Sequence, residues 1–450
     1  MTKKFDLIVI GTGEAGSTVA KRCRSAGWDV AVIDSRPFGG TCALRGCTPK
    51  KVLVNAAELI DWNRRMVGKG LSDQGTHIDW STLIHFKKTF TEPVPPKREK
   101  QYADAGIALF HGWARFVEKT TIHVGDDTLT GRYILIATGA KPAELGIPGE
   151  EYLTTSDEFL DLEQLPQRII FVGGGYISFE FAHVAVRAGA QVQILHEGEL
   201  TLEHFDPDLV AKLVQATRDI GIDIRLSTTA KAIEKGSKHL IVNTADENGE
   251  QKLAADMVVH GASRMPELDE LDLEKADVKR EKKGVSVNEY LQSVSNPAVY
   301  AAGDAAAGNK PQLTPVASME ANVVASNLLK GNHHKPDYTE VPSAVFTMPR
   351  LAFVGLTEEM ARKQGLKFKI NYQDTSDSLF TREFAMKYSA FKVLIEEDSN
   401  RILGAHLLGP HAEEVINVFA TAIRAGFTTD DIKKMIYAYP TGASDISDMV

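Results

Sequence analysis

The sequence predicts an α/β protein with two parallel-sheet domains followed by a C-terminal α+β domain. Three observations support this prediction. A buried strand, a glycine-rich loop, a helix and a second strand follow one another near the N-terminus, and the same order returns at residues 168–197. From about Tyr338 the pattern changes to strand, turn, strand and helix, and then to a β-hairpin. A repeated strand–helix–strand order is typical of parallel sheets covered by helices.

Length and composition narrow the class of protein. With 450 residues the chain is expected to form about three domains of roughly 150 residues each. It is 43% apolar and 25% charged, and its net charge of −9 argues against nucleic-acid or anionic-membrane partners. No stretch approaches the roughly 20 apolar residues of a membrane span, and the N-terminal apolar run leads directly into a glycine loop. We therefore expect a cytoplasmic protein with no nucleic-acid and no membrane partner.

The first glycine loop has the pattern of a dinucleotide-binding fingerprint. The buried strand FDLIVI (5–10) precedes the loop, and a helical pattern and the strand VAVID (30–34) follow it. The fingerprint residues are Gly11, Gly13, Gly16 and, at the end of the second strand, Asp34. In this context the glycines let the backbone approach a pyrophosphate, and the acidic residue accepts hydrogen bonds from ribose hydroxyls. A glycine turn that only precedes a packed helix is the alternative.

The second glycine loop repeats this arrangement at residues 168–197. Gly173 and Gly175 match the first two glycines, and Ser178, a small residue, replaces the third. Two fingerprints in one chain suggest two dinucleotides, one in each domain. We place domain boundaries near residues 150, 268 and 338.

Two of the three cysteines, Cys42 and Cys47, lie close together in GGTCALRGCTPKK (39–51). This spacing allows a disulfide, and in a reducing compartment a close pair is catalytic or metal-binding more often than structural. A helix is predicted to begin near Cys47, and its N-terminus, Lys50 and Lys51 would lower the pKa of a thiol. A zinc half-site and two inert core cysteines are the alternatives. Because zinc needs four ligands and no second Cys or His pair stands out, we expect no metal site.

These features together resemble the flavoprotein disulfide reductases, the family of glutathione reductase, dihydrolipoamide dehydrogenase and mercuric reductase. The motifs GGTC-x4-C-x-P-K, the two fingerprints, ATG, Y-A-x-G-D and FT-x-P…VGLTE occur in the family's order over nearly the whole chain. The resemblance implies two Rossmann-like dinucleotide-binding domains, one for FAD and one for NAD(P), and a C-terminal α+β dimerisation domain that makes a homodimer. The implied ranges are 1–150 with 268–337 for FAD, 151–267 for NAD(P) and 338–450 for dimerisation.

The resemblance also implies a reaction. The chain would be an FAD-dependent pyridine nucleotide-disulfide oxidoreductase, in which NADH or NADPH supplies electrons that pass through FAD to the cysteine pair. A small-molecule disulfide would then accept them. Cys47 would face the flavin as a thiolate and form a charge-transfer pair with it, while Cys42 would attack the substrate. Lys50 would pair with Glu180 near the flavin.

Further residues match the family's cofactor contacts. The FAD contacts that the resemblance implies are Gly11, Gly13, Gly16, Asp34, Thr41, Ala114, Thr138, Gly139, Arg264, Asp304 and Thr314. The nicotinamide contacts that it implies are Gly173, Gly175, Tyr176, His196 and Glu197.

The residue at the acidic position of the second fingerprint indicates whether NADH or NADPH is used. His196 stands where Asp34 stands in the first fingerprint, so the acidic residue is absent there, although Glu197 follows. Family enzymes that use NADPH place arginines where Glu197 and Glu203 stand, and carboxylates would repel a 2′-phosphate. We predict a preference for NADH.

The C-terminal motif departs from the family. Its disulfide reductases end in H-P-x-x-x-E, whereas this chain reads YPTGAS (439–444), followed by Asp445. Tyr439 therefore replaces the catalytic histidine, and tyrosine, with a reference pKa of roughly 10, is a poor base at neutral pH. Ser444 replaces the glutamate that orients the histidine, and Asp445 is the nearest substitute.

This departure leaves the electron acceptor open. A soft metal ion such as Hg(II) or Cu(II) needs thiolates but no histidine base, so a metal-ion reductase of mercuric-reductase type is the alternative. The C-terminal cysteine pair of mercuric reductase is absent, however, since the chain ends in SDMV. A redox-sensing flavoprotein with low turnover is a third interpretation.

The expected substrate cleft also differs from that of glutathione reductase. Glu14 and Asn322 replace a small polar residue and an arginine at glutathione-binding positions, and only Lys21 remains basic. The prolines of TEPVPPKRE (91–99) are predicted to interrupt a helix that lines the cleft in the family.

Overall fold

In the computed structural model of this protein, residues 2–73 and 75–450 are described. The chain divides into two compact units. The first consists of Met1–Lys50, His85–Ala143 and Ser263–Tyr338, and the second consists of Lys51–Ile84, Glu144–Ala262 and Thr339–Val450.

The first unit is built on a sheet whose central strands are parallel. The strand order is β3-β2-β1-β6-β5-β4, and β18 pairs with β6. The apolar run at the end of β1 is buried, as expected for a parallel strand with both faces covered. The strands are β1 (Lys3–Ile10), β2 (Val30–Asp34), β3 (Ala108–His111), β4 (Ala114–Glu118), β5 (Thr121–Val124), β6 (Asp127–Ile136) and β18 (Val299–Ala301).

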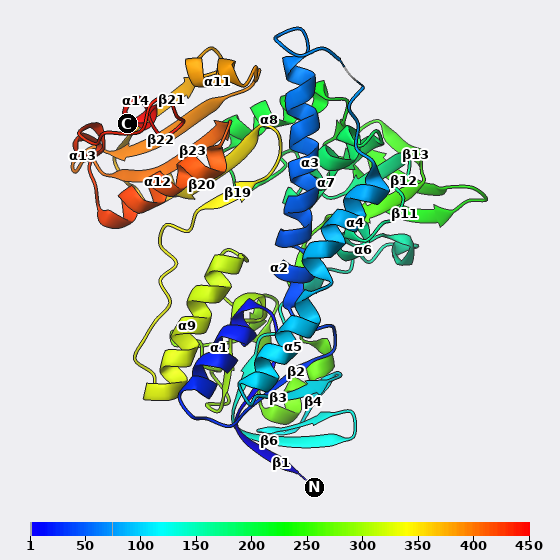
Figure 1. Ribbon diagram of the computed structural model, residues 1–450, viewed down its shortest axis with the longest axis vertical. Coiled ribbons are helices and arrows are strands. Elements are labelled where there is room, and N and C mark those ends of the chain that lie inside the picture. Colours follow the sequence, from blue (N-terminus) through cyan, green and yellow to red (C-terminus); the bar gives the residue numbers. More distant parts are fainter. Residues whose placement is uncertain (1, 74) are drawn as a thin grey trace. The chain divides into compact units, whose positions relative to one another are not determined.

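Helices α1 and α9 pack against each other in this unit, and Figure 1 shows them side by side. Helix α1 begins directly after the first glycine loop, and the short α2 and the long α3 carry the two cysteines. The helices that contribute to the first unit are α1 (Glu14–Ser25), α2 (Gly40–Arg45), α3 (Cys47–Met66), α4 (Trp80–Thr91), α5 (Val94–Asp104) and α9 (Thr314–Lys330).

The predicted proline break lies between α4 and α5. Helix α4 ends at Thr91, and α5 begins at Val94 with prolines in its first turn. A proline in the first helical turn removes an N–H that has no intrahelical partner, so Pro95 and Pro96 end one helix without preventing the next. The interruption is confirmed, and the helix resumes sooner than the prolines alone suggested.

The second unit contains a parallel sheet with the order β10-β9-β8-β14. Helix α7 follows the second glycine loop and packs on this sheet, and a separate three-stranded sheet, β11-β12-β13, follows in the chain. The elements are α6 (Ser156–Leu160), β8 (Arg168–Val172), α7 (Tyr176–Arg187), β9 (Gln191–Leu195), α8 (Pro207–Asp219), β10 (Asp223–Arg225), β11 (Thr229–Lys235), β12 (Leu240–Asp246), β13 (Gly249–Ala255) and β14 (Met257–His260).

The C-terminal part of the second unit is an antiparallel sheet covered by helices. Its order is β19-β20-β23-β22-β21, and α12 packs on β20 and β23. The β-hairpin that the sequence predicted is formed by β22 and β23. The elements are β19 (Ser343–Val345), β20 (Arg350–Gly355), α10 (Glu358–Lys363), β21 (Phe368–Asp374), α11 (Leu379–Glu383), β22 (Ala390–Glu396), β23 (Ile402–Gly409), α12 (Ala412–Ala425), α13 (Thr429–Lys433) and α14 (Ile446–Met449).

Short elements complete the two units. The two-stranded pairs are β7 (Ala140–Pro142) with β15 (Arg264–Pro266), and β16 (Arg280–Glu281) with β17 (Gly284–Val285). The 3₁₀ helices are η1 (Glu150–Tyr152), η2 (Asp269–Leu271), η3 (Leu273–Ala276) and η4 (Gly303–Ala305).

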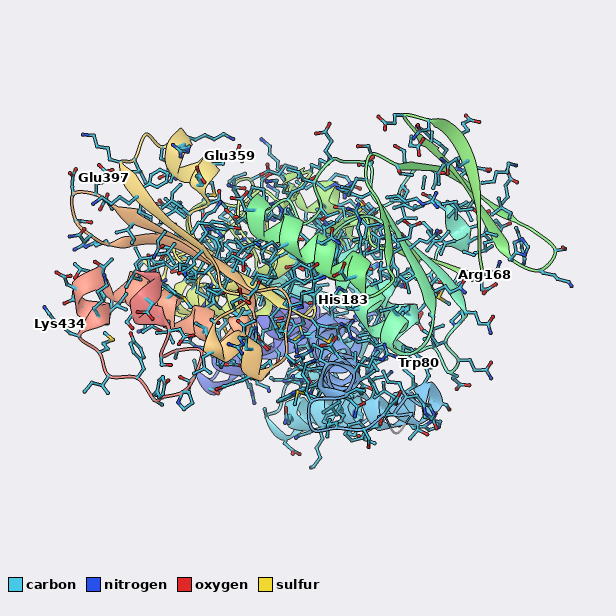
Figure 2. All side chains as sticks on the ribbon, turned by 90° about the horizontal axis from the view of Figure 1, so that it is seen from above. Trp80, Arg168, His183, Glu359, Glu397 and Lys434 are labelled. Carbon is cyan, nitrogen blue, oxygen red and sulfur yellow. The ribbon has the colours of Figure 1, made fainter. Side chains whose placement is uncertain are left out.

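A buried polar network lies inside the second unit. His183 on α7 is labelled in Figure 2 and is fully buried, with Nε2 at 3.0 Å from Thr217 Oγ1 and Nδ1 accepting from the N–H of Met348 at 3.2 Å. One turn later Arg187 pairs with Asp61 at 2.6 Å. Both ring nitrogens of His183 therefore have hydrogen-bond partners inside the unit, which is a structural role.

The predicted fold class is confirmed: both strand–loop–helix–strand units and the C-terminal α+β region are present. The three predicted domain ranges remain a prediction. Among the described residues, no helix is long and apolar enough to cross a membrane.

Candidate functional site

The two cysteines of the motif lie in the first unit as free thiols. Cys42 is half-buried in α2, and Cys47 is the exposed first residue of α3. The hydroxyl of Thr314, the first residue of α9, lies 3.5 Å from the sulfur of Cys47. The first residues of α3 and α9 therefore lie in contact at the dithiol. The predicted helix that begins near Cys47 is confirmed as α3.

The environment makes the two thiols unequal. Three contacts together lower the pKa of Cys47 to about 6 against the opposing effect of burial: first a hydrogen bond from Cys42, then the Thr314 hydroxyl and the positive charge of Lys50. The same hydrogen bond raises the pKa of Cys42, and burial adds to the increase. Near neutral pH the site therefore holds a Cys47 thiolate beside a Cys42 thiol. Lys51, which the sequence also suggested as a cause, stacks instead on the ring of Phe346 at 4.5 Å.

The first glycine loop lies against the end of β6. Gly11 has φ 101°, and a Cβ there would lie 2.3 Å from the carbonyl oxygen of Ala137. Thr138, the next residue, has a buried hydroxyl without a hydrogen-bond partner among the described residues. Such a group is costly unless a ligand completes it. The glycines of the loop, which lack side chains, and the unpartnered Thr138 hydroxyl fit the FAD that the resemblance implies. Gly139 follows Thr138 with φ 74°.

Asp34 supports the first loop from the end of β2. Its carboxylate accepts hydrogen bonds from the N–H of Thr12 at 2.8 Å and from the Thr12 hydroxyl at 2.6 Å. Because a carboxylate offers about four acceptor positions, capacity remains for ribose hydroxyls. Ala114 opens β4 two residues after Gly112, whose N–H donates to the Asp34 carbonyl at 2.9 Å. These predicted FAD contacts are therefore neighbours.

Asp304 is presented by a turn that a buried ion pair holds. Gly303 donates its N–H to Glu320 at 2.7 Å, and its carbonyl accepts from Lys310 at 3.0 Å. Lys310 and Glu320 form an ion pair whose side chains are 4% and 0% exposed, and the Tyr338 hydroxyl donates to Glu320 at 2.5 Å. Burial raises the pKa of Asp304, and the charge of Arg264 opposes this increase. A half-buried carboxylate in this turn fits a ligand that donates hydroxyl hydrogen bonds.

The second glycine loop repeats the geometry of the first within the second unit. Gly173 has φ 107°, and a Cβ there would lie 2.5 Å from the carbonyl oxygen of Gly261. Gly175 caps the N-terminus of α7, where Tyr176 stands half exposed. A helix of this length offers free N–H groups to a pyrophosphate, so these residues fit a pyridine nucleotide.

His196 accepts a backbone N–H of the second glycine loop, as Asp34 accepts a backbone N–H of the first. Its Nδ1 accepts the N–H of Gly174 at 3.2 Å, and its Nε2 lies 2.8 Å from the carbonyl oxygen of Leu200. This pattern assigns the ring proton to Nε2 and leaves neither nitrogen to accept from a ribose. Glu197 is exposed directly after it.

The predicted catalytic residues are divided between the two units. Cys42, Cys47 and Lys50 belong to the first, and Glu180 and Tyr439 belong to the second. Glu180 is 2% exposed and accepts the N–H of Phe346 at 2.9 Å. Its pairing with Lys50 remains a prediction.

The altered C-terminal motif has neither the histidine nor the orienting glutamate of the family. Tyr439 is 75% exposed, and none of the described residues is hydrogen-bonded to its side chain. Ser444 donates its hydroxyl to the carbonyl oxygen of Thr441 at 2.6 Å, so it does not take the place of the orienting glutamate. Burial raises the pKa of the Asp445 carboxyl, although the Ser444 hydroxyl opposes this.

Sequence reasoning missed three residues around the site. Lys310, Glu320 and Tyr338 belong to no motif, although Glu320 lies on the buried face of α9 beside Val316 and Val323. A carboxylate at an apolar position of a helix was the signal that marked it. The described residues contain no group of three His, Cys, Asp or Glu side chains that would hold a metal ion.

Comparison with known proteins identifies the family. The model of the pyridine nucleotide-disulphide oxidoreductases matches residues 5–321, and the model of their dimerisation domain matches residues 341–450. Glutathione reductase of Burkholderia cepacia is 32% identical over 447 residues, which cover 98% of this chain and 97% of that protein. Mercuric reductase of Staphylococcus aureus is 31% identical over 453 residues, which cover 98% and 81%.

The solved structures lead to the same family. The Cu(II) complex of the HOCl-induced flavoprotein disulfide reductase RclA from Escherichia coli matches with a TM-score of 0.89 and 28% identity. The match covers 100% of this chain and 99% of that chain. Taken with the dithiol and the two fingerprint loops, these likenesses show that the chain belongs to the pyridine nucleotide-disulphide oxidoreductases, enzymes that use FAD and NAD(P)H.

Proposed function

We propose that this oxidoreductase uses a small-molecule disulfide as its electron acceptor. The observation that carries the proposal is the pair of unequal thiols, a Cys47 thiolate with a pKa lowered to about 6 beside a Cys42 thiol with a raised pKa. Bound FAD supplies the chemistry that takes electrons from the nicotinamide and delivers them to this pair. The residues of the chain then complete a thiol–disulfide exchange.

The exchange balances in two displacements. The Cys42 thiol loses its proton as its sulfur attacks one sulfur of the substrate, so that a mixed disulfide forms and the S–S bond of the substrate breaks. The first product thiolate leaves and takes up that proton. The Cys47 thiolate then attacks the sulfur of Cys42 and expels the second product thiolate. The substrate gains two electrons, and the two cysteines lose them as their disulfide forms. The Thr314 hydroxyl, at 3.5 Å from Cys47, stabilises the thiolate between turnovers.

We propose the cofactor contacts predicted from the sequence on the support of the loop geometry. FAD would be held by the first glycine loop, the unpartnered hydroxyl of Thr138 and the turn that presents Asp304, and the nicotinamide by the second loop and Tyr176. The remaining proposed FAD contacts are Gly13, Gly16, Asp34, Thr41, Ala114, Gly139, Arg264 and Thr314. The FAD, NAD(P) and dimerisation domains would occupy 1–150 with 268–337, 151–267 and 338–450.

A homodimer and a cytoplasmic location belong to the same proposal. The match to a dimerisation domain over residues 341–450 supports the homodimer. The three cysteines, which are all free thiols, support a compartment that keeps thiols reduced.

A soft metal ion is the second candidate acceptor. It is favoured by the C-terminal motif, where Tyr439 is exposed and the Ser444 hydroxyl is hydrogen-bonded to the carbonyl oxygen of Thr441. The motif therefore holds no oriented histidine that would protonate a leaving thiolate. Reduction of Hg(II) or Cu(II) has no thiol leaving group, and thiolates are suitable ligands for such ions. A mercuric reductase and a copper complex of a disulfide reductase are among the similar proteins.

Anaerobic prereduction by NADH followed by reoxidation tests the proposal. The reduced holoenzyme is mixed with glutathione disulfide, lipoamide, cystamine, Hg(II) and Cu(II), and flavin absorbance is followed by stopped flow. Fast reoxidation by a disulfide is expected, whereas fast reoxidation by metal ions alone would transfer the assignment to the second candidate. Slow reoxidation by every acceptor would support a redox sensor with low turnover.

A further inference from the structure

A carboxylate that the proposed mechanism does not use stands beside the dithiol. Glu14 is the first residue of α1 and is half-buried, and its Oε1 accepts a hydrogen bond from the Ser318 hydroxyl at 2.7 Å. Ser318 lies four residues after Thr314 on α9, so the two hydroxyls lie on the same face of that helix. Because Thr314 contacts Cys47 at 3.5 Å, one face of α9 connects the carboxylate to the dithiol.

A second contact brings Glu14 close to Cys42. Gly40 opens α2 with φ 73°, and a Cβ there would lie 2.3 Å from the Cα of Gly13. Gly13 directly precedes Glu14, and Gly40 lies two residues before Cys42. The backbones of the two loops therefore touch, and this contact holds the start of α1 against the helix that carries Cys42.

The electrostatics agree with this placement. The hydrogen bond with Cys47 contributes most to the raised pKa of Cys42, burial adds to it, and the negative charge of Glu14 raises it further. The Thr314 hydroxyl acts in the opposite direction. A carboxylate whose charge acts on a thiol will also act on the charge of any molecule whose sulfur approaches that thiol.

Two positive charges lie beside the later turns of α1: Arg98, which belongs to α5, and Lys21 of α1 itself. Arg98 donates to the Ser17 hydroxyl at 2.9 Å, one turn after Glu14, and Lys21 lies a further turn along the helix with its Nζ at 3.3 Å from Gln101 Oε1. Burial and the charge of Arg98 lower the pKa of Lys21, and Glu14 opposes them. The positive charge of Lys50 acts on Cys47, whereas the negative charge of Glu14 acts on Cys42, the thiol that attacks the substrate. The attacking sulfur therefore has a carboxylate nearby, and the positive charges of Arg98 and Lys21 lie one or two turns along α1.

We propose that Glu14 is a specificity-determining residue that disfavours acceptors with a negative charge next to the reacting atom and favours neutral or cationic ones. The proposal rests on the proposed function, because it concerns the molecule that reoxidises the dithiol. Glu14 would discriminate between small disulfides by the charge beside their sulfur atoms. It would favour cystamine-like disulfides and metal cations over acidic disulfides.

A series of disulfides with the same core tests this proposal. The NADH-reduced holoenzyme is reoxidised by cystamine, bis(2-hydroxyethyl) disulfide and dithiodiglycolate, which carry a cation, no charge and an anion close to the sulfur. The wild type should react in that order of decreasing rate. Glu14→Gln, which keeps an acceptor for Ser318, should raise the ratio of the dianion rate to the neutral rate on the order of tenfold, as removal of one nearby unit charge implies. Glu281→Gln, at an exposed carboxylate of β16, is the control and should leave the ratio unchanged.

A second measurement does not depend on turnover. In a Cys47→Ser background, the pH dependence of Cys42 alkylation by iodoacetamide is followed by mass spectrometry with and without Glu14→Gln. The Glu14→Gln variant should be alkylated faster at neutral pH. An unchanged charge ratio overturns the proposal even if the alkylation profile moves, and an unchanged profile overturns it as well. If none of the three disulfides reoxidises any variant while Cu(II) does, the disulfide assignment fails, and the cation preference is tested by the Cu(II) rate, which Glu14→Gln should lower.

Discussion

The hydroxyl of Thr314 lies 3.5 Å from the sulfur of Cys47, where α9 and α3 both begin. The family resemblance implied only that Thr314 contacts FAD. The structure gives it a second role, because its hydrogen bonds lower the pKa of both thiols.

Thr314→Val is expected to raise the pKa of Cys47 above about 6, because valine removes a hydrogen bond that favours the thiolate. The thiolate dominates above the pKa, so a higher pKa leaves less thiolate at a fixed pH. Loss of one hydrogen bond should slow alkylation of Cys47 at pH 6 about threefold. Peptide mapping of the reduced protein after brief iodoacetamide treatment measures this rate, and Thr314→Ser should restore it. Equal rates in wild type and Thr314→Val would contradict the role of the hydroxyl.

Cys47→Ser should abolish the long-wavelength absorption band of the two-electron-reduced holoenzyme, because a serine hydroxyl does not ionise near neutral pH. Cys42→Ser should keep the band, since Cys47 remains. In the wild type the band should appear as pH rises through about 6, where the Cys47 thiolate forms. Anaerobic titration with NADH, followed by absorbance between pH 5 and 8, measures this. A band that survives in Cys47→Ser but not in Cys42→Ser would reverse the two roles.

His196→Asp should strengthen the binding of NADH and weaken that of NADPH. An aspartate would accept the N–H of Gly174, as His196 does at 3.2 Å, and still accept from ribose hydroxyls, as we propose for Asp34. Its charge would repel a 2′-phosphate, so the ratio of the two dissociation constants should shift about tenfold. Equilibrium titrations of oxidised protein with both nucleotides give the ratio. His196→Asn, which keeps an acceptor without a charge, should shift it much less, and equal shifts in both variants would rule out an effect of charge.

Lys310→Met should weaken FAD binding and lower the free energy of unfolding. Removing one partner of a buried ion pair leaves Glu320 as an unpaired charge, at a cost of about 3–5 kcal/mol, and frees the carbonyl of Gly303. FAD retention after gel filtration and denaturant unfolding of the holoenzyme measure the two effects. Since the single variant risks unfolding, Lys310→Met with Glu320→Gln removes both charges and should fold, yet it should still release FAD more readily than wild type. Normal FAD affinity in that double variant would show that the contacts of Lys310 and Glu320 with Gly303 have only a structural role.

The sequence predicted the parts of the fold that repeat a local pattern. The strand–glycine loop–helix–strand order around Gly11 and Gly173 appears in the structure because glycine alone tolerates the close approach to Ala137 and Gly261. The β22–β23 hairpin was visible for a similar reason, since two apolar runs flank a polar turn. The strand β21 was missed, because its side chains are mostly exposed and its polar sequence has no strand signature.

The site was predictable where chemistry needs a fixed residue type and unpredictable where it needs only proximity. The cysteine pair and Asp34 were found from spacing. The contact of Glu14 with Ser318 joins residues more than 300 positions apart in the chain, and no local pattern brings such residues together. The hydrogen bonds of Lys310 and Glu320 with Gly303 were unpredictable for the same reason, because they depend on how α9 packs against the turn at Gly303.

Tyr439→His tests whether the lost base limits disulfide turnover. Tyr439 is 75% exposed, so a histidine would be solvated and would keep a pKa near its ordinary value of roughly 6.5. Turnover with a disulfide should then rise as pH increases through that value, by about tenfold, which is less than an oriented base provides because Ser444 gives no support. Adding Ser444→Glu should increase the gain, whereas Tyr437→His, two residues away, is the matched control and should have no effect. Reoxidation by Cu(II) should not change in any of these variants, because no thiol leaves. If neither Tyr439→His nor the double variant reacts faster with any disulfide, a missing proton acceptor is not what limits the enzyme, and the altered motif would no longer favour a metal acceptor.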